Sequence, residues 1–408
     1  MNGIFAIDKP GGITSNQFMM KLQHALTSSQ IFSKEIQRAT AERMREYQQQ
    51  TGKKASKRKL RKVSKVKMGH GGTLDPLASG VLVIGIGSGT KKLANYLSGT
   101  VKEYEAEALF GVSTTSGDVE GEILSRNSVA HLNTEDIKSV EEKFKGCLKQ
   151  TPPIFAALKM NGKPLYEYAR EGKPLPRAIE PRQVTIYDLK LFPDTLSKNH
   201  KYPILRPESG EVKDDIKLLN SGLLDDTLYF SKEYCESRGM ESEVAQIERP
   251  LPITEQETGQ IEKFGNEYRA PLLHFTAKVS SGTYIRSLIS DIGKAVRSSS
   301  YMVKLTRSQQ QDWSLNRRNV FKLEDFIQRD EKVWSKVLEL VLEKGAEIDV
   351  VDELAKAEKE FASEKQKTEK INQVNDDHNE SNLSTETLAV ETHPNEANTK
   401  KRTIDEIE

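Results

Sequence analysis

The chain has 408 residues, of which 36% are hydrophobic and 30% charged, and its formal net charge is +1. A chain of this length can bury a large core, and no apolar run approaches the ~18 residues that a membrane span requires. The N-terminus lacks the basic region of a secretory signal. The two cysteines, Cys147 and Cys235, are too few and too far apart for a disulfide framework or a zinc site. We therefore expect a soluble, intracellular protein without a metal ion.

The near-neutral total hides an uneven distribution of charge. Residues 352–408 carry 15 acidic and 8 basic side chains, a net charge of −7, so the remaining chain carries +8. Residues 53–67 hold nine basic side chains and no acidic one. Such a run repels itself unless water or phosphates surround it. We expect it to contact RNA and to direct nuclear import, and a solvated arm without a function is the alternative.

The hydrophobic pattern predicts a domain in which strands and helices alternate. Apolar runs and period-two alternation predict strands at residues 4–7, 81–86, 104–110, 184–191 and 275–280. Helical periodicity predicts a helix capped by Ser15 and helices at residues 91–97, 134–144 and 283–296.

Two inserts and a tail interrupt or follow this pattern. Residues 30–68 form a polar, basic insert that we expect to be partly helical, and residues 197–265 form a second insert that we expect to be partly disordered. A last amphipathic helix after Trp334 completes a domain of residues 1–345. Residues 352–408 contain one aromatic side chain, Phe361, so we expect a disordered acidic tail.

The most distinctive stretch is the glycine-rich segment 69–80, Gly-His-Gly-Gly-Thr-Leu-Asp-Pro-Leu-Ala-Ser-Gly. Its glycines and Pro76 force a defined backbone path, and Asp75 is the only acidic residue in a long stretch of chain. A lone carboxylate held in this way suits nucleophilic or acid–base chemistry. A local role for Asp75, in its own turn or as a cap, remains open on spacing alone.

A second glycine-rich segment, residues 85–92, does not fit a nucleotide site. Thr90 stands where the P-loop needs its second glycine, and the same residue replaces the third glycine of the dinucleotide fingerprint. The sequence therefore argues against an ATPase or a dehydrogenase.

Several motifs in chain order resemble those of one enzyme family. Besides the Asp75 segment they are Asp-Lys-Pro-Gly-Gly-Ile-Thr-Ser at 8–15, Lys-Glu-Tyr at 102–104, Pro-Pro-Ile-Phe-Ala-Ala-Leu-Lys at 152–159 with Gly-Lys-Pro-Leu-Tyr at 162–166, Ser-Gly-Thr-Tyr-Ile-Arg-Ser-Leu at 281–288, and Leu-Thr-Arg at 305–307. Together they resemble the TruB family of pseudouridine synthases. The match covers most of residues 1–195 and 268–330, and the inserts and tail resemble its fungal, stand-alone members.

The resemblance implies an α+β fold, in which helices flank a mostly antiparallel mixed sheet with a central RNA-binding cleft. It implies an isomerase that flips the T-loop uridine at position 55 of tRNAs and converts it to pseudouridine. The reaction breaks the C1′–N1 bond, turns the uracil and joins C5 to C1′. Neither a cofactor nor a guide RNA is expected.

Roles for individual residues follow from the same resemblance. Asp75 is the essential carboxylate, acting at C1′, at C6 or on the C2′ proton, and the sequence does not choose between these routes. Arg286 is the cation that keeps Asp75 charged. Tyr104 stacks on the target base and relays the C5 proton, although a core tyrosine is the alternative. Tyr284 and Leu305 form the other walls of the uracil pocket, although an ordinary core leucine is the alternative for Leu305.

The remaining site predictions concern RNA contact. His70 is expected to fill the place of the flipped base, with a general-base role as the weaker alternative. Lys9, Lys91 and Lys159 are expected to contact RNA phosphates or to support the Asp75 loop. Basic residues of the insert that are expected to contact RNA are Lys57, Arg58, Lys59, Arg61 and Lys62.

Two other functions remain open on sequence grounds. One is the catalytic subunit of a guide-RNA-directed synthase, but an acidic tail follows the catalytic motifs here in place of a folded RNA-binding domain. The other is an RNA-binding or tRNA-folding protein whose chemistry is secondary. We expect a monomer that acts on the tRNA T-arm, with similar mRNA stem-loops as further targets and no membrane partner. The expected locations are the nucleus, the mitochondrion and the cytoplasm.

Overall fold

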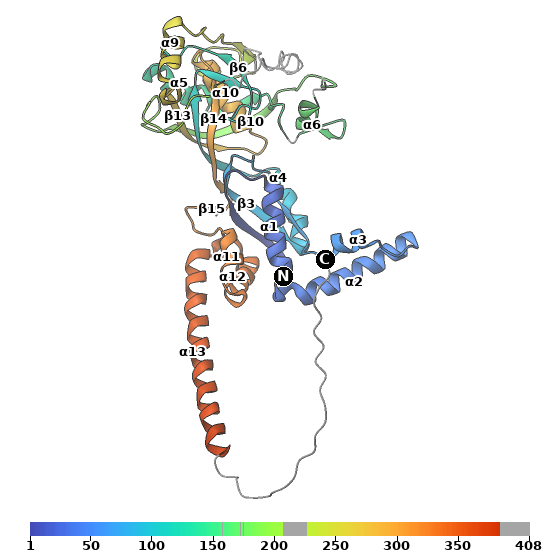
Figure 1. Cartoon of the computed structure of the whole chain (residues 1–408). Helices are drawn as coiled ribbons and strands as arrows, with labels where there is room; N and C mark the ends of the chain where they lie inside the picture. Colours follow the sequence, from blue (N-terminus) through green and yellow to red (C-terminus); the bar gives the residue numbers. More distant parts are fainter. Residues whose placement is uncertain (157, 172, 174, 207–226, 384–408) are drawn as a thin grey trace, which may run out of the picture. The chain divides into compact units, whose positions relative to one another are not determined.

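We describe the protein from a computed structural model, which is shown in Figure 1. It describes residues 1–383 except 157, 172, 174 and 207–226, and it describes side chains as far as residue 369, apart from Lys62 and Arg170. The chain forms two compact units, Met1–Ala357 and Glu358–Glu408. All the residues assigned to a site above belong to the first unit.

A nine-stranded sheet forms the centre of the first unit. Seven of its strands lie in the order β1 (Gly3–Lys9), β3 (Ser79–Ile86), β14 (Ser300–Gln310), β4 (Lys102–Phe110), β13 (Leu272–Val279), β10 (Arg182–Leu191) and β7 (Gly146–Gln150). Strand β2 (Met68–His70) pairs with β3, and β15 (Trp313–Ser314) pairs with β14. Only β3 and β14 run parallel among the paired strands described. The predicted α+β class with a mostly antiparallel mixed sheet is therefore confirmed.

Strand β4 shows how the two faces of the sheet differ. Tyr104 and Ala106 are buried, whereas Glu105 and Glu107 alternate with them and point to the other face. The buried residues join a core with helix α5 (Thr134–Phe144) and helix α10 (Ile285–Ala295), which cover this face (Figure 1). On the other face a smaller core gathers around Tyr301.

The second insert contributes to both cores. Ile204 packs in the cluster around Tyr301, and Leu228, Phe230 and Cys235 are buried in the larger core. It contains strand β11 (Thr227–Leu228), helix α8 (Lys232–Ser237), strand β12 (Gln246–Ile247) and helix α9 (Glu255–Phe264). Residues 197–206 and 227–265 therefore belong to the folded unit, while residues 207–226 lie outside the described residues, so the expectation of a partly disordered insert stays a prediction.

Helix α1 (Ser15–Ser28) begins at Ser15, so its cap lies one residue earlier than predicted. Thr14 is the N-cap, and its side chain accepts a hydrogen bond from the Gln17 amide at 3.1 Å. The prediction that Ser15 caps the helix is wrong, because Ser15 is its first residue and its hydroxyl bonds elsewhere. Near α1, helices α11 (Leu323–Ile327) and α12 (Glu331–Lys344) pack an aromatic cluster against Phe5 of β1.

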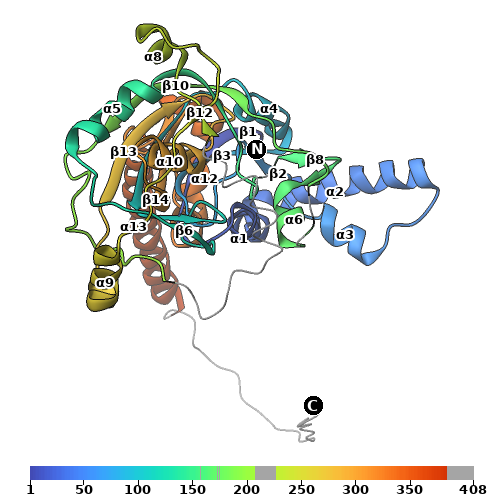
Figure 2. The ribbon, with the colours of Figure 1, turned by 90° about the horizontal axis from the view of Figure 1, so that it is seen from above.

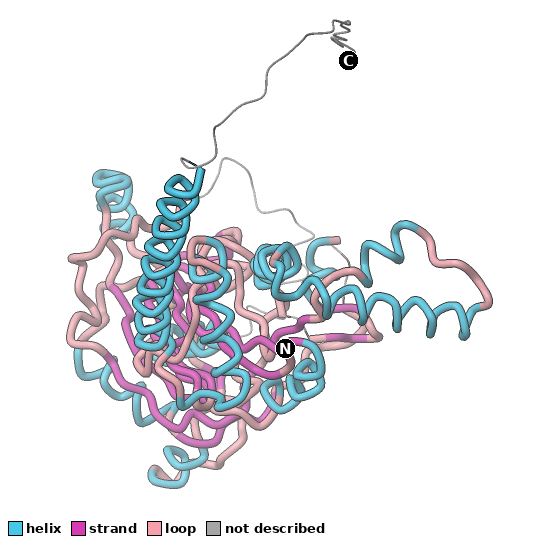
Figure 3. The backbone as a smooth tube through the Cα atoms, turned by 90° about the horizontal axis from the view of Figure 1, so that it is seen from below, coloured by secondary structure: helices cyan, strands magenta, loops and turns pink. Residues whose placement is uncertain are grey.

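The first insert folds into a pair of helices, α2 (Gln30–Thr51) and α3 (Lys57–Val63). The two lie side by side and extend away from the sheet in both Figure 2 and Figure 3. Partial helicity was predicted for residues 30–68 and is confirmed.

The remaining elements connect these layers. They are η1 (Gly87–Leu93), α4 (Ala94–Leu97), β5 (Val112–Thr114), β6 (Ile123–Arg126), β8 (Lys159–Met160), β9 (Lys163–Pro164), α6 (Leu165–Arg170), η2 (Gly265–Glu267) and η3 (Gly345–Glu347). Among the described residues no helix is both long and apolar enough to cross a membrane.

Helix α13 (Val350–Leu383) occupies most of the segment predicted to be a disordered tail. Its first turns belong to the first unit, where Val350, Leu354 and Ala357 are buried. The prediction of disorder is therefore wrong for residues 352–383, and the core extends past residue 345. Residues 384–408 lie outside the described residues.

Candidate active site

Asp75 and Arg286 form a two-point ion pair. Asp75 lies in the loop between β2 and β3, and Arg286 is in the first turn of α10. Nε of Arg286 lies 2.9 Å from Oδ2 of Asp75, and one terminal nitrogen of Arg286 donates to Oδ1 at 3.2 Å. The Arg286 side chain is 6% exposed and the Asp75 side chain 33% exposed. The guanidinium thus fixes both carboxylate oxygens, while one side of Asp75 stays open to a substrate.

Arg286 is itself held by groups from three other segments. It donates to the carbonyl oxygens of Ser116 at 2.7 Å and Phe155 at 3.0 Å. A second, buried carboxylate lies close, because Oδ2 of Asp118 is 3.9 Å from Nε. The start of α10 is fixed by Gln150, whose side chain accepts from the Tyr284 amide at 2.8 Å. These contacts leave the guanidinium little freedom to turn away from Asp75.

The N-terminal segment holds the Asp75 loop from one side. Lys9 has no exposed surface, and its ammonium donates to Pro10, Pro76 and Ala78 carbonyls at 2.8, 3.4 and 2.6 Å. Ser15 both accepts from the Leu74 amide at 2.9 Å and donates to its carbonyl at 2.8 Å. Burial lowers the pKa of Lys9 to about 8, although Asp75 acts in the opposite direction. Of the two roles expected for Lys9, phosphate contact and support of the loop, these hydrogen bonds and the burial of the ammonium favour support of the loop.

Strand β14 holds the same loop from the other side. Arg307 donates to the carbonyls of Val81 at 2.7 Å and Gly72 at 3.1 Å, and the Gln310 amide donates to Gly71 at 2.6 Å. Gly80, the second residue of β3, has φ +103°, and a Cβ there would lie 2.2 Å from the Arg307 carbonyl oxygen. Glycine at position 80 is therefore required by the close parallel pairing of β3 with β14.

The aromatic and apolar residues expected around uracil meet beside this loop. Tyr104 and Leu305 are buried in one cluster with Leu74 and Ile285. Tyr284 lies at the start of α10, two residues before Arg286, and is half-buried. Burial raises the pKa of Tyr284, so its hydroxyl stays protonated at neutral pH. Tyr104 and Leu305 thus share a core cluster with neighbours of Asp75 and Arg286 in the chain, while the charges of Arg286 and Asp75 act on Tyr284.

His70 enters the site from β2, where it pairs with Ile84 of β3. Its side chain is half-buried, and burial, followed by the charge of Arg307, lowers its pKa. His70 is thus a neutral ring at neutral pH, which is compatible with stacking. Its role in base flipping stays a prediction.

The other residues predicted to contact RNA are two separate lysines and the basic residues of α3. Lys91 and Lys159 are exposed, so their contact with RNA stays a prediction. The described basic side chains of α3 are also exposed, and their contact with RNA stays a prediction: Lys57, Arg58, Lys59 and Arg61. The side chain of Lys62 lies outside the described residues.

Sequence reasoning assigned no role to Asp118, Arg307 and Gln310. Asp118 follows Ser-Gly between two short strands, a pattern typical of an ordinary turn. Arg307 belongs to a quoted motif, but the carbonyls it binds are 226 and 235 residues away in the chain. A hydrogen bond between residues so far apart in the chain cannot be predicted from a single sequence.

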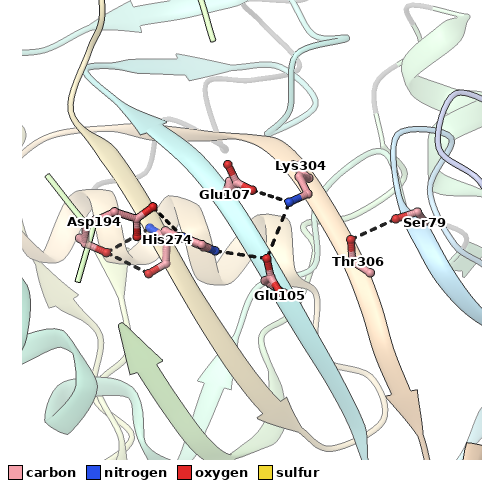
Figure 4. Close-up of polar contacts among 8 residues, drawn as sticks. Ser79, Glu105, Glu107, Asp194, His274, Lys304 and Thr306 are labelled. Atoms are coloured by element: carbon pink, nitrogen blue, oxygen red, sulfur yellow. Dashed lines mark hydrogen bonds and ion pairs between the residues drawn. The ribbon is translucent and has the colours of Figure 1, made fainter. Parts of the chain in front are cut away.

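On the face of the sheet opposite Tyr104, one group of described residues has the side-chain types that could bind a metal ion. Ligand atoms of Glu105, Glu107 and His274 lie within 4.8 Å of one another, as Figure 4 shows. Lys304 already places its ammonium 3.7 Å from Glu105 and also pairs with Glu107. His274 bonds Asp194 at 2.9 Å through its second ring nitrogen. We interpret the group as an ion-pair network across three strands and the 192–197 turn.

The chain matches known proteins along its whole length. Residues 57–201 match the family described as TruB family pseudouridylate synthase (N terminal domain). It is 69% identical over 407 residues to tRNA pseudouridine synthase 4 of Saccharomyces cerevisiae, with 100% of each chain covered. It is 34% identical to tRNA pseudouridine synthase 4 of Schizosaccharomyces pombe, covering 79% of this chain and 82% of that one.

A solved structure described as "Crystal Structure of a Cbf5-Nop10-Gar1 Complex" is similar at 17% identity and a TM-score of 0.40. The similarity covers 80% of this chain and 54% of that chain, so the present chain spans about half the length of that protein. The full-length match to the yeast protein, with the matched family segment, confirms the family expected from the motifs. The chain belongs to the TruB family of pseudouridine synthases.

Proposed function

We propose that this protein is an isomerase that converts the T-loop uridine at position 55 of tRNAs to pseudouridine. It acts as a monomer, without a guide RNA and without a cofactor. Similar stem-loops in mRNA are further substrates. The names of its relatives in two yeasts, both tRNA pseudouridine synthases, support the substrate class.

The observation that carries the proposal is the partly open Asp75 carboxylate on the fixed guanidinium of Arg286. Its two bonds, at 2.9 and 3.2 Å, orient the carboxylate before a substrate arrives. A preorganised charge costs no rearrangement at the moment of reaction. A loop held from both sides by Lys9, Ser15, Arg307 and Gln310 keeps that geometry.

The reaction can be assigned to side chains step by step. The target nucleotide leaves its stack, and His70 takes the vacated place. Tyr104 stacks on the uracil, with Tyr284 and Leu305 beside it. Asp75 attacks C1′ or C6 or removes the C2′ proton, so that the C1′–N1 bond breaks and the uracil turns. C5 then bonds to C1′, N1 gains a proton and the C5 proton leaves through the Tyr104 hydroxyl.

Three further parts of the proposal concern where and how the protein works. The RNA lies in a cleft across the middle of the sheet, on the face that carries Tyr104. The protein acts in the nucleus, which the basic run at 53–67 supports, and in the mitochondrion and cytoplasm. Lys91 and Lys159 contact phosphates, which their exposure permits.

Tritium release tests the proposal directly. An unmodified tRNA transcript containing 5-tritiated uridine is incubated with the purified protein and a chelator, without guide RNA, and the modified position is mapped. The expected result is the release of one tritium per tRNA, with pseudouridine at position 55. Tight tRNA binding without release would contradict the proposal and indicate a guide-dependent enzyme or an RNA-binding protein.

A further inference from the structure

The α2–α3 helix pair carries a surplus of positive charge. Residues 30–67 contain 13 lysines and arginines against three glutamates. Two of these glutamates have partners already, since Glu35 binds the N-terminal amine at 2.6 Å and Glu42 lies 3.9 Å from Arg38. The exposed cations on and beside α3 are Lys53, Lys54, Lys57, Arg58, Lys59, Arg61, Lys65 and Lys67. No carboxylate of the described part pairs with these eight.

The helix pair is fixed to the body at both of its ends. At its entry, Phe32 is buried and the Gln30 amide donates to Glu331 of α12 at 3.0 Å. At its exit, Val66 is buried, and its carbonyl accepts from the Gln23 side chain at 2.8 Å. Because both ends are fixed, the helix pair presents its charges in a defined direction. An unstructured, solvated segment would not do so.

The two helices are also tied to each other. Arg43 of α2 donates to the carbonyl of Val63 at 2.6 Å, and the Lys59 ammonium lies 5.0 Å from the centre of the Tyr47 ring. Beyond Phe32, however, α2 has no fully buried residue, and Leu60 of α3 is 43% exposed. The helix pair therefore adds little to the hydrophobic core. Stabilisation of the fold does not explain why these two helices are present.

The basic segment lies close in the chain to the active-site residue His70. Four residues, 64–67, join α3 to β2, and the carbonyl of Lys67 accepts from the Gly87 amide at 2.8 Å. The exposed Lys67 is three residues from His70, at most about 10 Å of extended chain. Helix α2, with 22 residues, is about 33 Å long.

We propose that the α2–α3 helix pair binds the sugar–phosphate backbone of the substrate RNA beside the nucleotide that enters the active site. Its partner is a structured RNA, recognised through phosphates and not through base sequence. This inference rests on the proposed function for the choice of RNA, but its contacts supply affinity and orientation and take no part in the chemistry.

The test compares two variants with the same change in charge. The first neutralises exposed α3 side chains and combines Lys57→Gln, Arg58→Gln, Lys59→Gln and Arg61→Gln. The control neutralises exposed cations elsewhere that have no carboxylate partner in the described part, and combines Lys138→Gln, Lys198→Gln, Lys263→Gln and Arg317→Gln. Affinity for a tRNA transcript is measured at several salt concentrations, and single-turnover tritium release is measured at saturating enzyme.

The α3 variant should bind the transcript about 10- to 100-fold more weakly near 0.1 M salt. Its plot of log affinity against log salt should be less steep by about 0.7 to 0.9 for each phosphate that the variant no longer neutralises. The control variant should stay within about threefold of wild type, and the saturated rate of both variants should be unchanged. Circular dichroism and thermal melting check that both variants fold as the wild type does.

Affinity and salt dependence unchanged in the α3 variant would overturn the inference. If the same variant, as a fluorescent fusion, also failed to accumulate in nuclei, the basic run would be an import signal alone. The proposed function is tested separately, because a protein that binds RNA through α3 but releases no tritium would contradict only the synthase assignment.

Discussion

Asp75 and Phe155 share one nitrogen of Arg286. The same terminal nitrogen lies 3.2 Å from Oδ1 of Asp75 and 3.0 Å from the carbonyl oxygen of Phe155. The loop before β3 and the segment before β8 are therefore coupled through a single guanidinium. Movement of either segment would change the geometry of the carboxylate.

Arg286→Lys should slow single-turnover tritium release by a factor on the order of 10² to 10³. A lysine keeps the positive charge, but it cannot bond both Asp75 oxygens while also reaching Ser116 and Phe155. RNA affinity should change little, because the side chain is buried. Addition of free guanidinium to an Arg286→Ala variant should restore part of the rate. A lysine variant with the wild-type rate would mean that charge alone suffices.

Tyr104→Phe separates stacking from proton transfer. The ring remains, so RNA affinity should stay within about twofold of wild type. Loss of a positioned acid–base group reduces a rate by roughly 10² or more, and we expect a slowing of that order in tritium release. A variant with full activity would show that the ring serves only as a stacking surface and that water removes the C5 proton.

Lys9→Met should lower the free energy of unfolding by about 2 kcal/mol or more, because buried carbonyls of Pro76 and Ala78 lose their donor. The pKa of Lys9 is about 8 in the folded protein and 10.5 as its ordinary value. Between these values the unfolded chain binds more protons than the folded one, so stability of the wild type gains from rising pH. Denaturant unfolding at several pH values should therefore show that the free energy of unfolding of the wild type exceeds that of Lys9→Met by a growing amount from about pH 8 to about pH 10.5. A constant difference across that range would contradict the lowered pKa.

Gly80→Ala should destabilise the protein by about 3 kcal/mol or more and abolish activity. The new methyl group would meet the Arg307 carbonyl at 2.2 Å and push β14 away from β3. Gly99→Ala is the matched control, because φ is +75° there but nothing lies within 4 Å of the added carbon. That control should lose only about 1 to 2 kcal/mol, the cost of the left-handed backbone. Equal losses in chemical unfolding of the two variants would mean that contact with Arg307 is unimportant.

The regular elements were the most predictable part of the fold. The helix at 134–144 was predicted with its correct ends, because Asn133 caps it and Phe144 completes its apolar stripe. The strand at 104–110 begins two residues earlier, at Lys102. Within the site, the motifs located Asp75 and Arg286, and the structure places them in direct contact.

The failures have identifiable physical causes. The sequence could not choose between phosphate contact and loop support for Lys9, because its acceptors Pro76 and Ala78 lie 67 and 69 residues away. Helix α13 was predicted to be disordered from its composition, yet a helix satisfies its own backbone and gains from local pairs such as Lys356 with Asp352 at 2.8 Å.

The central claim, that Asp75 performs the chemistry of a tRNA pseudouridine synthase, is tested most directly by Asp75→Asn. The substitution keeps the size of the side chain and removes its charge. Single-turnover tritium release and tRNA affinity would be measured for both proteins with one transcript. We predict release from the wild type alone, a rate at least about 10³-fold lower in the variant, and tRNA affinity within a few-fold of wild type. Tritium release by Asp75→Asn at a rate close to that of the wild type would contradict the account.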